Sequence, residues 1–269
     1  MLFLFPGSGP GGLTHHFALR LPSYGRSRFR PCALGRRVLT RSIQFAAVAA
    51  IGFLIATACA VLVLGLARPP ASAFMLERSL AGLFNGKGIA DIQYRWVEWE
   101  SISRYMALAV VAAEDQKFPD HWGFDFESIS LALQERKTKG RLRGASTISQ
   151  QVAKNLFLWN GRSYLRKGLE AYFTVLIELM WSKRRILEVY LNIAEFGDGI
   201  YGVGAAAKNF FRKQPSRLSR RESAMLAAVL PNPKKFKVSS PSKYVQWRTR
   251  RIEKQMRNLG LSYLERIVR

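Results

Sequence analysis

The longest apolar stretch of the chain runs from Phe45 to Ala67, 23 residues without a charged side chain. About 20 such residues suffice to cross the hydrocarbon core of a bilayer. We therefore predict a single transmembrane anchor over residues 43–68. A buried soluble helix of this length would be unusually apolar on all sides. A cleavable signal peptide has a shorter apolar region, although Ala71-Ser72-Ala73 resembles a cleavage tripeptide.

The residues that flank the apolar stretch predict its orientation. Residues 1–42 contain seven arginines and no acidic residue, and only Arg68 is charged between the stretch and Glu77. The positive-inside rule then places residues 1–42 in the cytoplasm and exports residues 69–269. The tail is rich in Gly, Pro, Ser and Arg without periodicity, so we expect it to be disordered.

Helical patterns dominate the exported part. One short stretch, Ile92–Trp96, alternates apolar and polar residues and predicts a half-buried strand. Helices are predicted by apolar periodicity and by capping residues. Their expected ranges are 103–114, a helix opened by Asp125, a helix opened by Ser146 or Thr147, 164–181, 182–195, 205–211, a helix capped by Ser219 with Glu222 that stops before Pro231, and 244–269. The fold class is therefore mainly α with a minor β element.

Charge and side-chain inventory restrict the partners. The net charge is +24, and residues 69–269 alone carry 34 basic and 18 acidic residues, a balance of +16. A basic domain close to a bilayer favours anionic membrane lipids, whereas nucleic acid is a poor candidate beyond the membrane. The exported part has no cysteine and one histidine, His121, which argues against a zinc site. Asp115, Asp120 or Asp125 would be the oxygen ligands of a divalent cation.

The first candidate for chemistry is Glu114. It follows the apolar run Tyr105–Ala113, so its carboxylate is placed to be partly desolvated, which raises its pKa and makes it a better base near neutral pH. The alternative is that Glu114 and Asp115 merely close a helix. Acidic residues at a helix C-terminus oppose the helix dipole, so this placement needs a compensating reason, and a catalytic role would be one.

A second polar cluster, Gly144–Asn155, follows about one helix later. At helical spacing Gln150, Gln151 and Lys154 are neighbours, with Ile148, Val152 and Leu156 as the buried stripe. We expect the amides and the cation to face outward together, as a surface for a sugar or a pyrophosphate; the alternative is an ordinary solvated face. Arg166 and Glu170, one turn apart, form either a surface ion pair or part of the same site.

Two motif matches are discarded. Gly197–Gly202 fits the dinucleotide pattern G-x-G-x-x-G, but a predicted helix precedes it where a strand is required. We interpret it as a tight loop. Ser240–Lys243 fits S-x-x-K, but Pro241 interrupts the helix which that motif needs, and no K-T-G follows.

Five segments in order resemble the peptidoglycan glycosyltransferases, and the resemblance covers about residues 90–235. The segments are 114–125, with Glu114, Asp115, Phe118, His121 and Gly123; 144–157, with Ser146, Thr147, Gln150, Gln151, Lys154 and Asn155; Arg166, Lys167 and Glu170; 183–202, with Glu188, Tyr190 and Asn192; and 222–231. Ser149 and Phe210 are small departures, where the family often has Thr and Tyr. Any single matching segment is modest evidence for the family, whereas five matching segments in the same order are highly specific.

The resemblance implies a lysozyme-like α fold and an inverting, processive transfer. In that reaction the 4-hydroxyl of a lipid-linked sugar attacks C1 of the growing chain and expels polyprenyl pyrophosphate. By position, Glu114 would be the base and Glu170 a second carboxylate, while Lys154, Arg166 and Lys167 would neutralise the pyrophosphate. The remaining implied substrate-binding residues are Asp115, His121, Ser146, Thr147, Gln150, Gln151, Asn155, Glu188 and Asn192.

The resemblance also implies partners and a location. Lipid II and the growing glycan chain would be the substrates, at the bacterial inner membrane with the catalytic domain in the periplasm and other cell-wall synthesis or division proteins as partners. No cofactor is required, with Mg or Mn as an optional divalent cation. Since the sequence has no transpeptidase motifs, we expect a monofunctional enzyme. A lytic transglycosylase and a non-enzymatic scaffold are the alternative functions.

Overall fold

The computed structural model describes residues 33–84, 91–139, 144 and 146–268. It divides into two units, Met1–Ile51 and Gly52–Arg269, which are described separately. Most of the expected disordered tail, residues 1–32, lies outside the described residues. Helix α1 (Ala33–Leu66) begins before residue 43, the expected start of the anchor. Within α1, Arg41–Leu66 is long and apolar enough to cross a membrane, and the mean hydropathy of an 18-residue window in it is 2.7.

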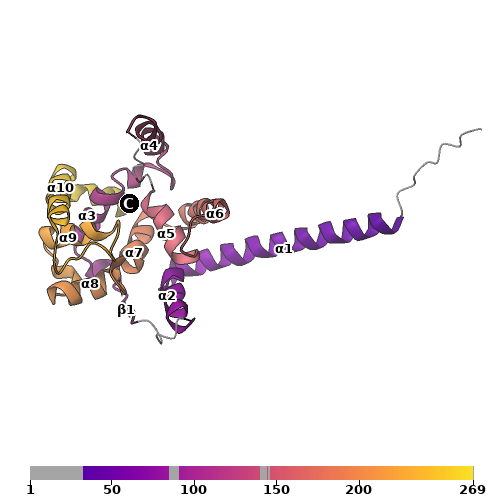
Figure 1. The fold of residues 1–269 in the computed structure, drawn as a ribbon, viewed down its shortest axis with the longest axis horizontal. Helices are drawn as coiled ribbons and strands as arrows, with labels where there is room; N and C mark the ends of the chain where they lie inside the picture. Colours follow the sequence, from indigo (N-terminus) through magenta and orange to yellow (C-terminus); the bar gives the residue numbers. More distant parts are fainter. Residues whose placement is uncertain (1–32, 85–90, 140–143, 145, 269) are drawn as a thin grey trace, which may run out of the picture. The chain divides into compact units, whose positions relative to one another are not determined.

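The described part of the chain is mainly helical, as the sequence predicts (Figure 1). After α1 the α-helices are α2 (Ala73–Phe84), α3 (Arg104–Glu114), α4 (Phe126–Lys139), α5 (Ile148–Phe157), α6 (Tyr164–Met180), α7 (Lys183–Ile193), α8 (Gly202–Phe211), α9 (Arg220–Val229), α10 (Lys243–Leu259) and α11 (Glu265–Val268). Short 3-10 turns lie at Trp99–Ser101, Phe118–Asp120, Pro215–Arg217 and Leu261–Leu264.

Helix α3 is the centre of the core. Its residues from Met106 to Ala112 are all buried, because apolar side chains occupy every side of the helix. It packs against α9 and α10, and α5 packs against α6 and α7 (Figure 1). An apolar helix enclosed in this way delivers its C-terminal residue, Glu114, from the core to the surface of a pocket.

The strands form one small sheet in the order β1-β3-β2. Strand β1 (Gln93–Tyr94) pairs in parallel with β3 (Ile200–Tyr201), which confirms a strand within the predicted stretch 92–96. Strand β2 (Glu195–Gly197) pairs antiparallel with β3. The segment interpreted as a loop is therefore a hairpin. Gly199, at φ +80°, supplies the left-handed turn residue that a tight hairpin requires.

Capping explains where the helices begin. Ser103 accepts a hydrogen bond from the backbone of Tyr105 at the start of α3. Ser219 and Glu222 form the predicted capping box of α9, which ends before Pro231. The expected helix over 244–269 is interrupted at Gly260, where φ is +73°, so α10 ends there and α11 follows after a 3-10 turn.

The last turns of α1 belong to the larger unit. Thr57 Oγ1 and Tyr172 Oη lie 2.7 Å apart. Trp181 Nε1 donates to the carbonyl of Val61 over 2.8 Å, and Arg185 Nη2 donates to that of Leu64 over 3.0 Å. Residues 57–64 are thus fixed against α6, α7 and the turn between them.

Candidate active site

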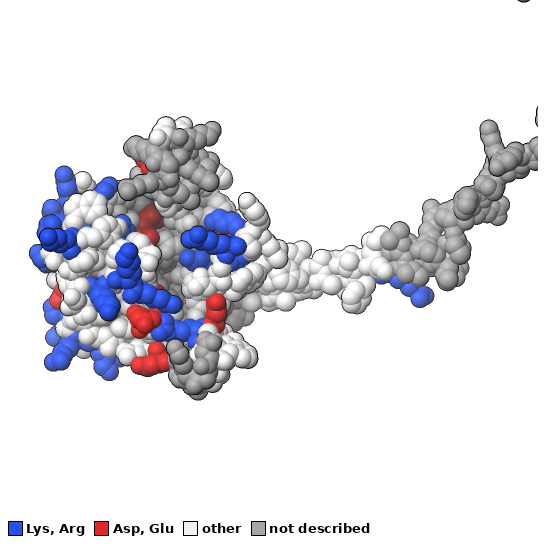
Figure 2. All heavy atoms as spheres, in the orientation of Figure 1, with Lys and Arg blue, Asp and Glu red and all other residues white. Residues whose placement is uncertain are grey.

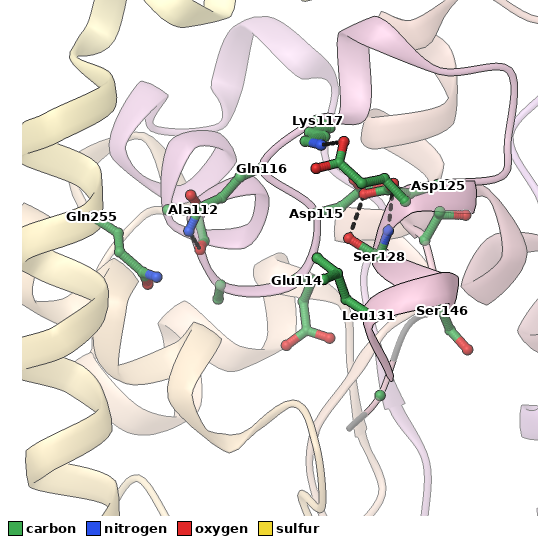
Figure 3. Close-up of a pocket in the computed structure, with 14 residues that line it drawn as sticks. Ala112, Glu114, Asp115, Gln116, Lys117, Asp125, Ser128, Leu131, Ser146 and Gln255 are labelled. Carbon is green, nitrogen blue, oxygen red and sulfur yellow. Dashed lines mark hydrogen bonds and ion pairs between the residues drawn. The ribbon is translucent and has the colours of Figure 1, made fainter. Parts of the chain in front are cut away.

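Glu114 lies at a cavity of about 400 Å³, which we call the Glu114 pocket. The pocket is lined by the end of α3, the first turns of α4, the segment before α5, and Gln255 of α10. In Figure 3 the Glu114 carboxylate points away from Lys117 and Asp125, and Gln255 projects from α10. Figure 2 shows a hollow between the surfaces over α10 and α6, with cationic side chains on both sides.

Two donors hold the Glu114 carboxylate. Gln151 Nε2 donates to Oε2 over 3.1 Å, and Arg248 Nη2 donates to Oε1, also over 3.1 Å. Burial raises the pKa of Glu114 above its ordinary value, while these two donors act against the shift. The Glu114 side chain is 14% exposed to solvent. A desolvated carboxylate whose ionised form is favoured by two donors suits a general base.

A group of cations surrounds the second carboxylate, Glu170. Arg166 Nη1 lies 2.9 Å from Glu170 Oε2, and Lys167 bonds to Oε1. Glu170 is almost fully buried, at 3% exposure. Burial lowers the pKa of Lys154, whereas the charges of Glu170 and Glu114 both raise it. Lys154 therefore lies within electrostatic reach of both predicted catalytic carboxylates. We call Lys154, Arg166 and Lys167 the cation cluster.

Asn155 and Ser146 have polar side chains that are available to a ligand. Asn155 Oδ1 is buried without a hydrogen-bond partner among the described residues. An unpaired buried acceptor is costly, so such atoms commonly await a ligand or a water molecule. Ser146 is exposed at the rim of the Glu114 pocket. Both positions are consistent with the predicted contacts to sugars or phosphates.

Asp115 and His121 fasten the loop after α3. The Asp115 carboxylate receives His121 Nε2 at 3.0 Å and the backbone N–H of Ile148 at 3.0 Å. Thr147 Oγ1 donates to the carbonyl of Gly123 over 2.6 Å. Gly123 has φ +79°, where a Cβ would lie 2.6 Å from Thr174 Cγ2. These side chains, predicted to bind substrate, are used to position the loop and the start of α5.

The expectation that Gln150 faces outward is wrong. Gln150 is buried, with 5% exposure, and its Oε1 accepts from the Thr147 backbone N–H over 3.1 Å. Thr147 Oγ1 accepts in return from the Gln150 backbone, so the pair is the capping box of α5. Gln151 and Lys154 remain partly exposed. The polar face of α5 is therefore narrower than the spacing suggests.

Glu188 and Asn192 also stabilise the fold, and their contact with substrate stays a prediction. Glu188 Oε1 accepts from the backbone of Trp99 over 2.9 Å. The fully buried Asn192 accepts from the N–H of Val97 over 2.7 Å and donates to its carbonyl over 2.9 Å. Both residues thus fix the segment that precedes α3, and neither lines the Glu114 pocket.

The three aspartates considered for a divalent cation do not form a common ligand set. Asp115 is engaged by His121 and by Ile148, Asp120 pairs with Arg266, and Asp125 caps α4 through Ser128. Among the residues that the structure describes, no group of three His, Cys, Asp or Glu side chains is arranged for a metal ion. These side chains therefore do not fit a resident ion.

Sequence reasoning missed Arg248 and the role of Tyr190. Arg248 lies 134 residues after Glu114, on a helix that reads as an ordinary basic amphipathic surface. Tyr190 is buried and donates to Gln151 Oε1 over 3.1 Å. No local pattern connects either residue with Glu114, because both contacts depend on helix packing.

Comparison with known proteins decides the family. The model of the family described as Transglycosylase matches residues 85–257. The chain belongs to the Transglycosylase family. It is a glycosyltransferase, and the resemblance stated from five sequence segments is confirmed. Its lysozyme-like, mainly helical domain is the one the sequence predicts.

Three relatives of this transglycosylase are each named biosynthetic peptidoglycan transglycosylase. The protein of Pseudomonas syringae pv. tomato is 53% identical over 225 residues, which cover 84% of this chain and 92% of the relative. That of Pseudomonas entomophila is 56% identical, with 74% and 84% covered. That of Escherichia coli K12 is 59% identical, with 71% and 79% covered. The similarity therefore extends over most of each protein.

Proposed function

We propose that this transglycosylase builds the glycan strands of peptidoglycan from lipid II, with Glu114 as the general base. The observation that carries the assignment is the Glu114 carboxylate, desolvated at a pocket and held by Gln151 and Arg248. Biosynthetic rather than lytic activity accords with the names of its relatives.

The proposed reaction is an inverting displacement. The 4-hydroxyl oxygen of lipid II forms a bond to C1 of the terminal sugar of the growing chain, and its proton passes to Glu114. The bond between C1 and the pyrophosphate oxygen breaks, and polyprenyl pyrophosphate leaves with the electron pair. Inversion at C1 yields a β-1,4 link. A base in such a step contributes about 10²–10⁴-fold to the rate.

The cation cluster would stabilise the leaving group. Negative charge develops on the pyrophosphate as the C1–O bond breaks, and fixed cations at that place lower the barrier. Glu170 orients Arg166 and Lys167 from its buried position. Because its carboxylate is used in these pairs, we assign Glu170 to the organisation of the cations. Asn155, with its unpaired Oδ1, would accept from a sugar hydroxyl or amide.

The proposed location is the bacterial inner membrane, crossed once by α1, with the N-terminus in the cytoplasm and the catalytic domain in the periplasm. The apolar character of Arg41–Leu66 and the seven arginines before residue 43 support it. Exposed apolar side chains on α2 and α6, among them Leu80, Phe84 and Leu179, suit contact with lipid. The basic surface would bind anionic lipids, and other cell-wall synthesis or division proteins are the proposed partners.

We also propose that the protein's own cations, rather than a resident metal, neutralise the pyrophosphate. Mg or Mn would then act only as an ion that accompanies the pyrophosphate. Polymerisation should persist, at a reduced rate, after EDTA treatment and recover on addition of either ion. Complete loss in EDTA, with recovery at a stoichiometric ion concentration, would contradict this proposal.

The deciding experiment compares the wild type with Glu114→Gln. Detergent-purified protein is incubated with labelled lipid II, and the products are separated by length. We expect polymer from the wild type and at least about a 100-fold lower rate from the variant. Finished peptidoglycan, supplied in parallel, tests lytic activity. Degradation of that substrate without extension of lipid II would overturn the biosynthetic assignment.

A further inference from the structure

Three side chains from three helices form a chain of hydrogen bonds that ends at the proposed base. Tyr190 of α7 donates its hydroxyl to Gln151 Oε1 over 3.1 Å. Gln151 of α5 donates from Nε2 to Glu114 Oε2, at the end of α3, also over 3.1 Å. Tyr190 is 1% exposed, so water does not compete for its hydroxyl. In each of the two bonds the donor is the residue farther from Glu114, so both bonds run in one direction, from Tyr190 to Glu114.

The direction matters because an amide has two unlike ends. Gln151 can stabilise an ionised carboxylate only when its NH₂ faces Glu114, since an ionised carboxylate only accepts hydrogen bonds. With the amide reversed, its carbonyl would oppose the carboxylate and favour the protonated acid. The group that faces the other end of the Gln151 amide, the end away from Glu114, therefore decides whether the ionised or the protonated form of Glu114 is favoured.

Tyr190 faces that second end. A phenol is a stronger hydrogen-bond donor than it is an acceptor, so its hydroxyl favours the amide carbonyl over the NH₂ group as a neighbour. Burial holds the pKa of Tyr190 well above its ordinary value, so the proton that it donates is retained. In this arrangement both ends of the Gln151 amide are satisfied only when the NH₂ group points to Glu114.

The other groups that act on Glu114 cannot perform this selection. Arg248 of α10 donates to the opposite oxygen, Oε1. Lys154 of α5 contributes a positive charge without a hydrogen bond to the carboxylate, and Asp115 contributes a negative charge that raises the pKa of Glu114. None of the three is hydrogen-bonded to the Gln151 amide in the described part of the chain.

We infer that Tyr190 is a positioning residue for catalysis, which fixes the orientation of the Gln151 amide and thereby keeps Glu114 ionised and ready to accept a proton. The inference rests on the proposed role of Glu114 as the base. Tyr190 does not line the Glu114 pocket, and in the described part of the chain its hydroxyl is bonded to Gln151 and not to Glu114. We therefore expect its effect to pass through Gln151.

The test is a double-mutant cycle read by pH. The acidic limb of kcat/KM for lipid II polymerisation reports the pKa of the base in the free enzyme. Tyr190→Phe, made in the full chain in detergent, should move this limb upward by about one pH unit, the scale of one hydrogen bond to a carboxylate. Well below the limb the rate then falls about tenfold, and at high pH it returns towards the wild-type value.

Gln151→Met supplies the second side of the cycle. It keeps the length of the side chain and removes both ends of the amide, so it should shift the limb by itself. Adding Tyr190→Phe to Gln151→Met should then change nothing further, because the residue through which Tyr190 acts is absent. Tyr94→Phe is the matched control, since Tyr94 donates its hydroxyl to the carbonyl of Pro69, away from the Glu114 pocket. Its limb should stay in place.

The outcomes separate the two proposals. An unmoved limb in Tyr190→Phe, or a shift that persists in the Gln151→Met background, overturns the positioning role while Glu114→Gln remains inactive. Full polymerisation by Glu114→Gln overturns the assignment of the base, and the positioning role with it. Melting temperatures of all variants are measured in parallel, because a purely structural loss lowers the rate at every pH and leaves the limb unmoved.

Discussion

Arg248 Nη2 lies 3.1 Å from Glu114 Oε1, across a sequence separation of 134 residues. The contact brings a cation from α10 to the buried end of α3. Burial raises the pKa of Glu114, and the hydrogen bond from Gln151 together with the positive charge of Arg248 acts against this rise, in favour of the ionised carboxylate. Helix α10 is therefore part of the proposed active site, although among its residues only Gln255 lines the Glu114 pocket.

Replacement of Arg248 by Gln should make the enzyme more sensitive to acid. Loss of the positive charge favours the protonated acid, so the pKa of Glu114 rises further above its ordinary value. The acidic limb of kcat/KM moves to higher pH by the same amount, and activity at high pH is retained. Arg250→Gln, on the exposed side of the same helix, is the control. Equal limbs in both variants would contradict the role of Arg248.

Lys154→Arg should remove the decline in polymerisation rate at alkaline pH, which we call the alkaline limb. Burial lowers the pKa of Lys154 below its ordinary value of 10.5, so the wild type loses this cation at a lower pH than an exposed lysine does. Polymerisation therefore falls as pH rises through that pKa. Arginine stays charged throughout this range, so the decline should disappear from the rate profile between pH 8 and 11. A decline retained in Lys154→Arg assigns the limb to another group.

Glu170→Gln should act through the cation cluster. The charge of Glu170 raises the pKa of Lys154, so its removal moves the alkaline limb to lower pH. Arg166 and Lys167 also lose the partner that orients them, and we expect kcat to fall about tenfold or more. Glu253→Gln, on α10, is the control for the loss of one negative charge. A change in KM alone would argue that Glu170 acts in substrate binding instead.

Asn192→Ala should lower stability rather than chemistry. The side chain is fully buried, and its amide joins α7 to Val97 through two hydrogen bonds. Removing it leaves buried backbone groups unpaired, at a cost of about 2–4 kcal/mol in the free energy of unfolding. The melting temperature should drop by about 5–15 °C. Asn209→Ala, with an exposed side chain on α8, should change it little.

The sequence predicts the helices well where the apolar stripe and the capping residue agree. Ser103 and Ser219 are correct caps, and Glu114 is correctly placed at the buried end of its helix. The prediction that Gln150 faces outward was wrong, although the sequence contains a signal for its inward position. Thr147 and Gln150 have the Thr-x-x-Gln spacing of a capping box, a signal that explains why this amide turns back to the helix start.

Other features could not be predicted because they depend on tertiary packing. Glu188 and Asn192 are polar residues whose neighbours lie some 90 residues earlier in the chain. Arg248 differs in no local respect from the other cations of α10, and only the contacts of α10 with α3 and α9 bring it to Glu114. Local patterns thus identify the chemical groups near the pocket, but they do not show which side chains are hydrogen-bonded or ion-paired to one another.

The attachment of the last turns of α1 to α6 and α7 has a practical consequence for producing the enzyme. A fragment that starts at residue 69 would discard Val61, which is fully buried, and would leave the Trp181 indole N–H without its acceptor. Tyr172 would lose Phe53 and Thr57 as neighbours. Expression fragments should therefore begin before Phe53, and shorter ones should precipitate or require more detergent.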